Sequence, residues 1–233
     1  MSKTLIFTAT YNESKNVKTL IEKLNKLNQD IDILVIDDNS PDKTWQILQN
    51  LEKDIPNLKV IIRGNKSGLD TAHKLAYEYA KNNDYSNFIS MDADLSHDPA
   101  EIPKIIDKLN EFPFVIGSRY SLGGKCEMTG FRLLLSSVGN KIFKYFLNIK
   151  CNEFTSSFRG FNLIKLKDFN FNMINSKGYS FFMETIYRIN KLGYEIKEIP
   201  IIFKNRTQGE SKIPKIEIFR TLKNLVILKF YDT

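Results

Sequence analysis

Short apolar runs alternate with amphipathic stretches through the first half of the chain. Five of the runs are typical of buried strands, at residues 5–8, 33–36, 58–62, 87–91 and 114–116. Between them, apolar residues recur at the three- and four-residue spacing of a helix face. Strands separated by helices favour right-handed crossovers and a mostly parallel sheet. The pattern therefore predicts an α/β fold, whose ligands bind beyond the carboxyl ends of the strands.

Each helix predicted between these strands has one apolar face, which we expect to pack against the sheet. No repeat, low-complexity segment or linker interrupts the chain, so the pattern predicts one domain over residues 1–233. The four faces consist of Val17, Leu20, Ile21, Leu24 and Leu27; of Trp45, Leu48 and Leu51; of Ala72, Leu75, Ala76 and Tyr79; and of Ile102, Ile105, Ile106 and Leu109.

The pattern changes after Gly117. Residues 132–147 form one long amphipathic stretch, residues 194–203 predict a strand, and residues 214–230 predict an apolar helix with interspersed lysines. Both helices could pack on the domain core or lie in a membrane interface, and their basic residues favour the interface. The first helix has an apolar face of Leu134, Leu135, Val138, Ile142 and Phe146, with Lys141 and Lys144 beside it.

The composition narrows the class of partner. The net charge is +7 in 233 residues, which indicates an anionic partner such as a phosphorylated substrate or an anionic lipid. No RNA-binding aromatic motif or helix-turn-helix signature is present, so we expect no nucleic acid. Cys126 and Cys151 lack zinc-site spacing and fit a reduced cytosolic compartment. No signal peptide or spanning segment is recognised, so we expect a soluble or peripheral protein.

The stretch from Asp92 to His97 is the most informative for chemistry. Asp92 and Asp94 follow an apolar strand and stand two residues apart, so extended backbone directs both side chains to one face. Carboxylates at that edge suit a hard divalent cation, which usually accompanies a nucleotide diphosphate. A loop that caps the next helix is the alternative, and a lone D-x-D pattern would favour it.

Three further strand ends carry polar clusters. Residues 8–13 and 37–44 precede predicted helices, and capping by Asn12 and a Ser-Pro-Asp turn are the alternative explanations. Two adjacent acids, Asp37 and Asp38, are harder to explain by capping alone. Residues 64–69 form a Gly-bounded basic turn that could approach a phosphate, although this motif is weak by itself.

Taken together, these clusters resemble glycosyltransferase family 2, and within it the dolichol-phosphate mannose synthases. The similarity covers essentially the whole chain, and the most specific motif is the last one, ahead of the final apolar helix. The motifs that carry it are Tyr11-Asn12-Glu13, Asp37-Asp38-Asn39-Ser40-Pro41-Asp42-x-Thr44, Asp92-Ala93-Asp94-Leu95-Ser96-His97, Gly117-Ser118-Arg119-Tyr120, Gly123-Gly124, Arg132, Thr155-Ser156, Gly178-Tyr179, Met183-Glu184 and Arg206-x-x-Gly209-Glu210-Ser211-Lys212.

The resemblance implies a GT-A nucleotide-sugar fold with a Rossmann-like, mostly parallel sheet flanked by helices and with C-terminal amphipathic helices. Residues 1–120 would form the nucleotide-sugar-binding half, and residues 121–233 the acceptor-binding half with interfacial helices. The implied reaction transfers mannose from GDP-mannose to a polyprenyl or dolichyl phosphate, with inversion and with Mg²⁺ or Mn²⁺. The implied location is the cytoplasmic face of a membrane, in peripheral contact, with room for a separate membrane-anchoring subunit.

The resemblance also assigns roles to individual residues. The metal ligands are Asp92 and Asp94, and the acceptor phosphate is received by Arg119, Arg132 and Ser136. The residues expected to act in catalysis are Asp94, Arg119, Arg206 and Lys212, the last two on a loop over the donor phosphates. The nucleotide-sugar set consists of Thr10, Tyr11, Glu13, Asp37, Asp38, Lys66, Asp92, Ala93, Asp94, Arg206 and Lys212.

Some residues depart from the family pattern. Ala9 replaces a usual Pro, which should change only local stiffness, and Asp70 replaces a common Gly. Glu153 and Ser157 replace an Asp and a Gly, so the acceptor pocket is expected to differ in shape. The acceptor phosphate is already ionised at neutral pH, so the reaction requires no base. We therefore expect His73 to be structural and His97 to support the metal motif or cap a helix.

Three alternatives stay open from the sequence. The same fold could transfer glucose or N-acetylglucosamine from a UDP-sugar to a polyprenyl phosphate. A family 2 enzyme with a saccharide acceptor would need a general base, and Glu184 is a candidate, although the Met183-Glu184 motif favours the lipid-phosphate group. A non-catalytic binding module is disfavoured, because the metal acids and the residues 206–212 motif are both retained.

Overall fold

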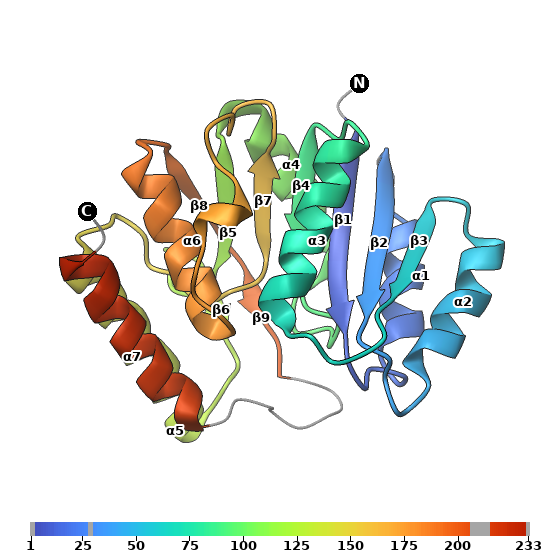
Figure 1. The fold of residues 1–233 in the computed structure, drawn as a ribbon, viewed down its shortest axis with the longest axis horizontal. Helices are drawn as coiled ribbons and strands as arrows, with labels where there is room; N and C mark the ends of the chain where they lie inside the picture. Colours follow the sequence, from blue (N-terminus) through green and yellow to red (C-terminus); the bar gives the residue numbers. More distant parts are fainter. Residues whose placement is uncertain (1–2, 28–29, 206–214, 232–233) are drawn as a thin grey trace.

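The computed structural model describes residues 3–27, 30–205 and 215–231, and it contains a seven-stranded sheet flanked by helices (Figure 1). The strand order is β3-β2-β1-β4-β7-β5-β8. All neighbouring strands pair in parallel except β7, which is antiparallel to both β4 and β5. The prediction of a mostly parallel α/β sheet is therefore confirmed.

The five strands predicted in the first half are present. They are β1 (Thr4–Thr10), β2 (Ile31–Asp37), β3 (Leu58–Ile62), β4 (Asn87–Ser90) and β5 (Phe114–Ser118). The register places Thr10 opposite Asp37 and Phe7 opposite Ser90. The polar clusters that follow β1, β2 and β4 consequently leave the sheet at the same edge.

The strand β7 (Arg159–Asn162) was not predicted, because four residues with a glycine and two polar side chains carry no alternating pattern. Gly160 is required where α4 (Ile102–Glu111) crosses the sheet, since a Cβ there would lie 2.5 Å from Cγ2 of Ile105. Because β7 runs against its neighbours, it begins at the edge where they end. The segment before it, residues 151–157, therefore lies at the carboxyl edge of the parallel strands.

The predicted strand at residues 194–203 is divided in two. β8 (Ile196–Pro200) completes the large sheet beside β5. β9 (Ile202–Phe203) instead pairs with β6 (Lys125–Cys126) in a separate two-stranded sheet. The prediction of a single long strand was thus wrong, because Pro200 cannot donate a ladder hydrogen bond and the chain leaves the large sheet after it.

Alternating residues of the strands build two cores, one on each face of the sheet. Ile6, Ile33 and Val35 face the helices α1 (Val17–Asn25), α2 (Thr44–Asp54) and α4. The opposite residues, Leu5, Phe7, Leu34 and Ile36, face α3 (Leu69–Asn82) and α6 (Tyr179–Lys191). Two short 3₁₀ turns, η1 (Pro99–Glu101) and η2 (Phe171–Met173), complete the layers.

One predicted helix face requires correction. Leu75 of α3 is 40% exposed, whereas His73 and Tyr77 are buried. The helix is rotated so that its aromatic residues reach the ring cluster of Phe7, Phe88 and Phe171. The Nδ1 of His73 donates to the Leu69 carbonyl at 2.9 Å, and burial lowers the pKa of His73 to about 4. The structure thus places His73 in the core as a neutral side chain.

The C-terminal helices α5 (Gly130–Leu147) and α7 (Lys215–Phe230) extend away from the sheet (Figure 1). α7 packs on α6 and α5, and the rings of Phe146 and Phe230 meet at 5.8 Å between centroids. Both helices leave apolar residues in solvent: Leu134, Leu135, Val138, Ile142 and Tyr145 on α5, and Phe219, Leu222, Val226, Ile227, Phe230 and Tyr231 on or just after α7. In the part of the chain that the structure describes, no helix is both long enough and apolar enough to span a bilayer.

Candidate functional site

The loops after β1 and β2 are held together by side chains of the second polar cluster. Thr10 Oγ1 donates to Asp37 Oδ2 at 2.7 Å, and the Ser40 amide and hydroxyl donate to the same carboxylate at 2.8 and 2.7 Å. Asp37 is fully buried, with 0% of its surface exposed. Its carboxylate therefore shapes the loop, as the turn explanation of this motif expected, and Thr10 is committed to it. Glu13 donates its amide to Thr44 Oγ1 at 3.0 Å.

Asp38 follows in the same cluster and is 8% exposed. Its carboxylate accepts hydrogen bonds from the Arg63 guanidinium and from the Ser67 amide. Nearby, Lys66 Nζ lies 4.0 Å from the centre of the Tyr11 ring. Tyr11, Asp38 and Lys66, predicted as nucleotide-binding residues, thus surround one part of the sheet edge. Arg63 was missed, although it follows β3 directly, and a polar residue at a strand end is the signal used for the other clusters.

The Asp92–Asp94 motif forms a tight turn beyond β4. Leu95 has a φ of 62°, a left-handed conformation that is unusual for a bulky residue and common at functional sites. Asp94 is 4% exposed and accepts the Ser96 amide at 3.0 Å, and Ala93 is also buried. Asp92 is half-buried, and its Oδ1 accepts the Ser157 hydroxyl at 2.6 Å.

His97 supports this turn. Its Nδ1 accepts the Asp92 amide at 3.3 Å and lies 3.7 Å from Asp92 Oδ2, while its Nε2 lies 3.5 Å from Ser156 Oγ. Burial lowers the pKa of His97 despite the neighbouring carboxylates. A neutral ring that accepts at Nδ1 carries its proton on Nε2 and donates it to Ser156. The structure therefore gives His97 the supporting place that the sequence predicted.

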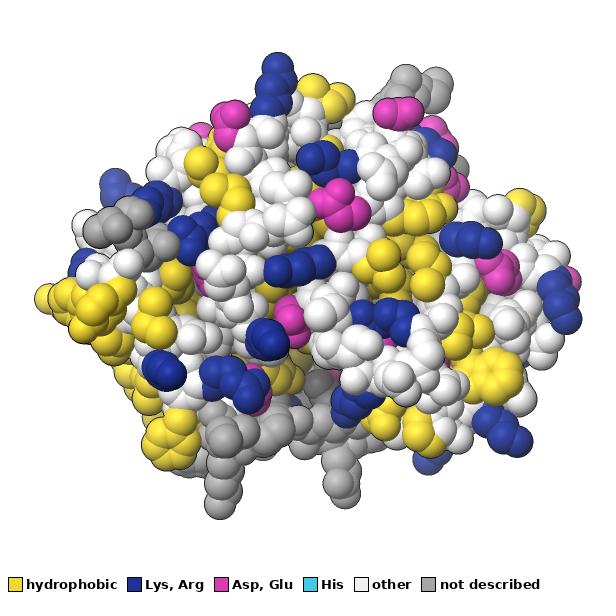
Figure 2. Space-filling view, viewed as in Figure 1, with side chains coloured by type: hydrophobic (Ala, Val, Ile, Leu, Met, Phe, Trp, Pro, Cys, Tyr) yellow, Lys and Arg dark blue, Asp and Glu magenta, His cyan; other side chains and the backbone are white. Residues whose placement is uncertain are grey.

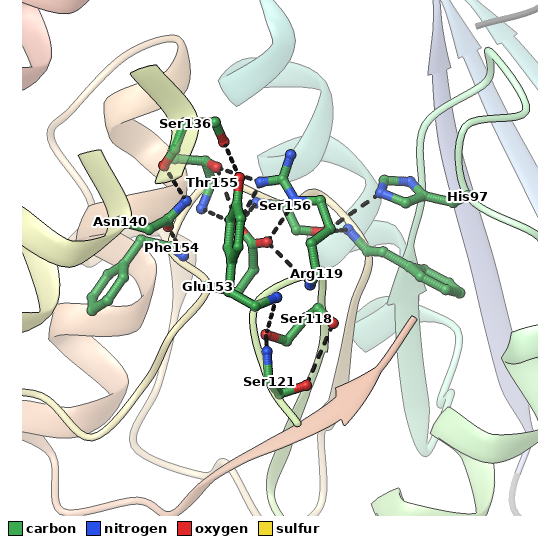
Figure 3. Close-up of polar contacts among 12 residues, drawn as sticks. His97, Ser118, Arg119, Ser121, Ser136, Asn140, Glu153, Phe154, Thr155 and Ser156 are labelled. Carbon is green, nitrogen blue, oxygen red and sulfur yellow. Dashed lines mark hydrogen bonds and ion pairs between the residues drawn. The ribbon is translucent and has the colours of Figure 1, made fainter. Parts of the chain in front are cut away.

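Arg119 follows β5 and is held by a buried ion pair. Its Nε and Nη2 each donate to Glu153 at 2.7 Å, and Nη2 also reaches Thr155 Oγ1 at 2.8 Å (Figure 3). Burial alone would lower the pKa of Arg119, but the charge and hydrogen bonds of Glu153 outweigh it and raise that pKa. Burial alone would raise the pKa of Glu153, and Arg119 holds it below its usual value. The Nη1 group takes no part in these bonds.

A cavity of about 340 Å³ connects the metal motif with the predicted acceptor residues. Asp92 lines it together with Arg119, Arg132 and Ser136. Ser136 accepts the Tyr120 hydroxyl at 2.8 Å, and Arg132 is exposed. The rest of the wall is largely apolar and comes from α5, α6 and α7, including Leu135, Val138, Ile142, Phe143, Phe182, Ile218 and Leu222. The cavity thus combines charged side chains, among them Asp92, Arg119, Arg132 and Glu217, with a larger apolar wall.

The remaining residues that the sequence singled out are Arg206, Lys212 and Glu184. Arg206 and Lys212 lie outside the described residues. Glu184, the candidate base for a saccharide acceptor, is 1% exposed and accepts hydrogen bonds from Arg188 at 2.9 Å and from the Ser176 amide at 2.8 Å. It lines a second cavity between α6 and α7, whereas Asp92 and Arg119 line the first. The structure therefore does not bring Glu184 to the metal motif.

Known proteins resemble this chain in sequence and in fold. The family model described as Glycosyl transferase family 2 matches residues 5–169. The chain belongs to this family. The matched residues include the loops after β1, β2, β4 and β5, and also residues 151–157.

Two curated relatives align along most of the chain. The polyprenol monophosphomannose synthase of Mycolicibacterium smegmatis is 31% identical over 214 residues, which cover 91% of this chain and 81% of that protein. The undecaprenyl-phosphate mannosyltransferase of Micrococcus luteus is 31% identical over 205 residues, which cover 88% of this chain and 84% of that protein. This family 2 transferase is therefore related to polyprenyl-phosphate mannosyltransferases.

Solved structures share the GT-A fold. The glucosyl-3-phosphoglycerate synthase of Mycobacterium tuberculosis, crystallised with Mn²⁺, UDP and phosphoglyceric acid, has a TM-score of 0.67 at 13% identity, over 97% of this chain and 77% of that one. A mannosyltransferase of Pyrobaculum calidifontis in complex with GDP-Man and Mn²⁺ has a TM-score of 0.59 at 16% identity, over 97% of this chain and 63% of that one. The predicted fold is thus confirmed.

The residues of the metal motif fit a divalent cation that arrives with a nucleotide. Among the residues that the structure describes, no group of three or more His, Cys, Asp or Glu side chains could hold a metal ion. Mg²⁺ is usually held by one or two carboxylates together with substrate phosphates and water. Asp92 and Asp94 supply two such carboxylates, so the donor set matches a metal–diphosphate complex better than a permanent metal centre.

The Arg119–Glu153 pair gives a first prediction. Glu153→Gln leaves the buried guanidinium without its counter-charge, and we expect the free energy of unfolding in urea to fall by roughly 3–5 kcal/mol. The matched control is Glu101→Gln, which breaks the surface pair with Lys104 at 2.7 Å and should cost less than about 1 kcal/mol. Equal small losses in the two variants would contradict a structural role for the pair.

Proposed function

We propose that the chain transfers a mannosyl group from GDP-mannose to a polyprenyl phosphate. The observation that carries this proposal is the cavity in which Asp92, Arg119 and Arg132 meet an apolar wall. A phosphate with a hydrocarbon tail matches a cavity lined by arginines and by apolar side chains, because burial of apolar surface is favourable and arginines bind phosphate oxygens. The two relatives at 31% identity are named as enzymes of polyprenyl- or undecaprenyl-phosphate mannosylation.

The proposed donor site lies at the carboxyl edge of β1, β2 and β4. Tyr11, Lys66 and Asp38 are proposed to contact the nucleoside, with the Asp38 carboxylate oriented by Arg63 and the Ser67 amide. Asp37 and Thr10 hold the loop that presents Asp38. Asp92 and Asp94 would hold a Mg²⁺ or Mn²⁺ ion, which when bound neutralises charge on the diphosphate leaving group. The choice of GDP and mannose rests on the sequence resemblance.

The proposed reaction is a single displacement. A phosphate oxygen of the acceptor attacks the anomeric carbon, the bond from that carbon to the β-phosphate oxygen breaks, and GDP leaves with the bonding electrons. Attack opposite the leaving group inverts the configuration. The nucleophile is already ionised, so the reaction needs no general base. This agrees with the position of Glu184 in the second cavity and with the lowered pKa of His97.

Two anions must approach each other for this reaction, so positive charge has to separate them. Arg132 and the Nη1 group of Arg119 are proposed to bind the acceptor phosphate. Arg132 can donate two parallel hydrogen bonds, whereas Arg119 is left with Nη1, because Glu153 and Thr155 accept from its Nε and Nη2. Ser136 lines the same cavity as these two arginines. Arg206 and Lys212, by resemblance, would close over the donor phosphates.

The exposed apolar residues of α5 and α7 support peripheral contact with the cytoplasmic face of a membrane. Leu135, Val138, Ile142 and Leu222 both line the cavity and remain partly in solvent, so the apolar wall continues onto the surface. Figure 2 shows hydrophobic side chains gathered at the end of the molecule occupied by α7, with Lys and Arg side chains beside them. Basic residues contribute about 1 kcal/mol each near an anionic leaflet.

The donor and the acceptor can be tested together. Vesicles containing a polyprenyl phosphate are incubated with Mn²⁺ and with labelled GDP-mannose, UDP-glucose or UDP-N-acetylglucosamine, and organic-extractable label is measured. We expect label from GDP-mannose alone. Asp94→Asn should lower the rate at least about a hundredfold, because it removes a charge that holds the cation against the leaving group.

The matched control is Asp107→Asn, on a carboxylate that is 70% exposed on α4. This variant should keep the wild-type rate. Label from a UDP-sugar would contradict the assignment of mannose, and transfer to water-soluble products alone would contradict the lipid acceptor. An unchanged rate in Asp94→Asn would contradict the metal role.

Membrane contact gives a separate prediction. The double variant Phe219→Ser, Phe230→Ser removes rings that are 72% and 64% exposed on α7, and sedimentation with anionic vesicles should fall by about tenfold or more. Ile164→Ser is the control, since Ile164 is 61% exposed in the turn after β7. Equal vesicle binding by the double variant and the wild type would exclude α7 as the contact.

A further inference from the structure

Residues 151–157 contact the Asp92 carboxylate through the side chain of Ser157. The Ser157 hydroxyl donates to Asp92 Oδ1 at 2.6 Å. Ser157 is itself fixed, because its carbonyl accepts the Ser90 hydroxyl at 2.6 Å and only 4% of its surface is exposed. Ser90 ends β4, so the backbone of Ser157 is anchored to the strand that precedes Asp92.

The backbone before Ser157 is held by hydrogen bonds from a buried guanidinium. Arg159 donates its Nε to the Ser156 carbonyl at 2.6 Å and its Nη2 to the Phe154 carbonyl at 2.8 Å. Its Nη1 reaches the Phe182 carbonyl of α6 at 2.7 Å. Two of these carbonyls belong to residues 154–157 and the third to α6, so one rigid, planar group ties this segment to the helix.

The other neighbour of the Asp92 carboxylate cannot orient it by a hydrogen bond. His97 Nδ1 lies 3.7 Å from Asp92 Oδ2, beyond hydrogen-bond distance, and already accepts the Asp92 amide. Of the side chains described around Asp92, Ser157 is therefore the one whose contact fixes the rotation of the carboxylate. Its bond occupies Oδ1 and leaves Oδ2 to face a ligand.

We propose that Ser157 is a positioning residue for the divalent cation, which holds Asp92 so that one carboxylate oxygen is presented to the metal. The proposal rests on the proposed function, since it assumes that Asp92 binds the cation. Hydrogen bonds to a ligating carboxylate fix its orientation and typically change metal affinity about tenfold or more when they are removed.

Residues 151–157 also hold Arg119 through Glu153. The loop thereby positions both the cation carboxylate and the guanidinium expected to receive the acceptor phosphate. The two contacts stand four residues apart in a segment that Arg159 ties to α6. Ser157 should consequently affect metal binding without loss of the Arg119–Glu153 pair.

The test measures Mn²⁺ binding by electron paramagnetic resonance, with the whole chain saturated with GDP and no sugar present. Ser157→Ala removes the hydroxyl, and Ser157→Cys replaces it by a weaker donor of similar volume. Both should raise the Kd for Mn²⁺ about tenfold, whereas Ser157→Thr keeps the hydroxyl and should stay within about twofold of the wild type. Ser180→Ala is the matched control, because this buried hydroxyl contacts Thr221 instead.

The outcomes separate this inference from the proposed function. Normal melting temperatures together with weaker Mn²⁺ binding in Ser157→Ala and Ser157→Cys, and rescue in Ser157→Thr, would support it. An unchanged Kd in Ser157→Ala, with weaker binding in Asp92→Ala, would overturn the role of Ser157 alone. An unchanged Kd in Asp92→Ala would overturn the metal assignment and, with it, this inference.

Discussion

The buried ion pair between Arg119 and Glu153 is the interaction on which the geometry of the site depends. Glu153 is fully buried, and among the described residues its charge is stabilised by Arg119 and by the amides and hydroxyl of its own loop. Burial of two charges is costly unless their hydrogen bonds are complete. Because these bonds are formed, the pair fixes the guanidinium of Arg119 and the path of residues 153–156 at the same time.

The reversed direction of β7 explains why this loop reaches the site at all. In a fully parallel sheet, a segment that precedes a strand lies at the amino edge, away from bound ligands. β7 is antiparallel to β4 and β5, so the segment before it meets the segments that follow them. Asp92 after β4 and Arg119 after β5 are thereby joined by one short loop, through Ser157 and Glu153.

The sequence predicted the parallel strands, because apolar runs are local signals, and the paired acids after β4 made the Asp92–Asp94 turn a candidate metal site. It did not predict β7, whose four residues are held by their neighbours and by the close approach of Ile105 to Gly160. It also treated Leu75 as buried, because spacing alone cannot say how an amphipathic helix is rotated. Of the candidate site, the acids and arginines were recognisable by motif, and Arg63 could have been found from its place after β3, whereas the Glu153 and Ser157 contacts depend on tertiary structure.

The cavity unites these features, since it joins a carboxylate of the metal motif to an apolar wall that continues onto α5 and α7. The most direct test is the effect of bound Mn²⁺ on the ³¹P relaxation of a short, water-soluble prenyl phosphate, with GDP present. The account predicts strong relaxation of the prenyl phosphorus by the wild type and its loss in Asp92→Ala. Relaxation no greater than that of inorganic phosphate free in solution would contradict a shared cavity for the cation and the acceptor.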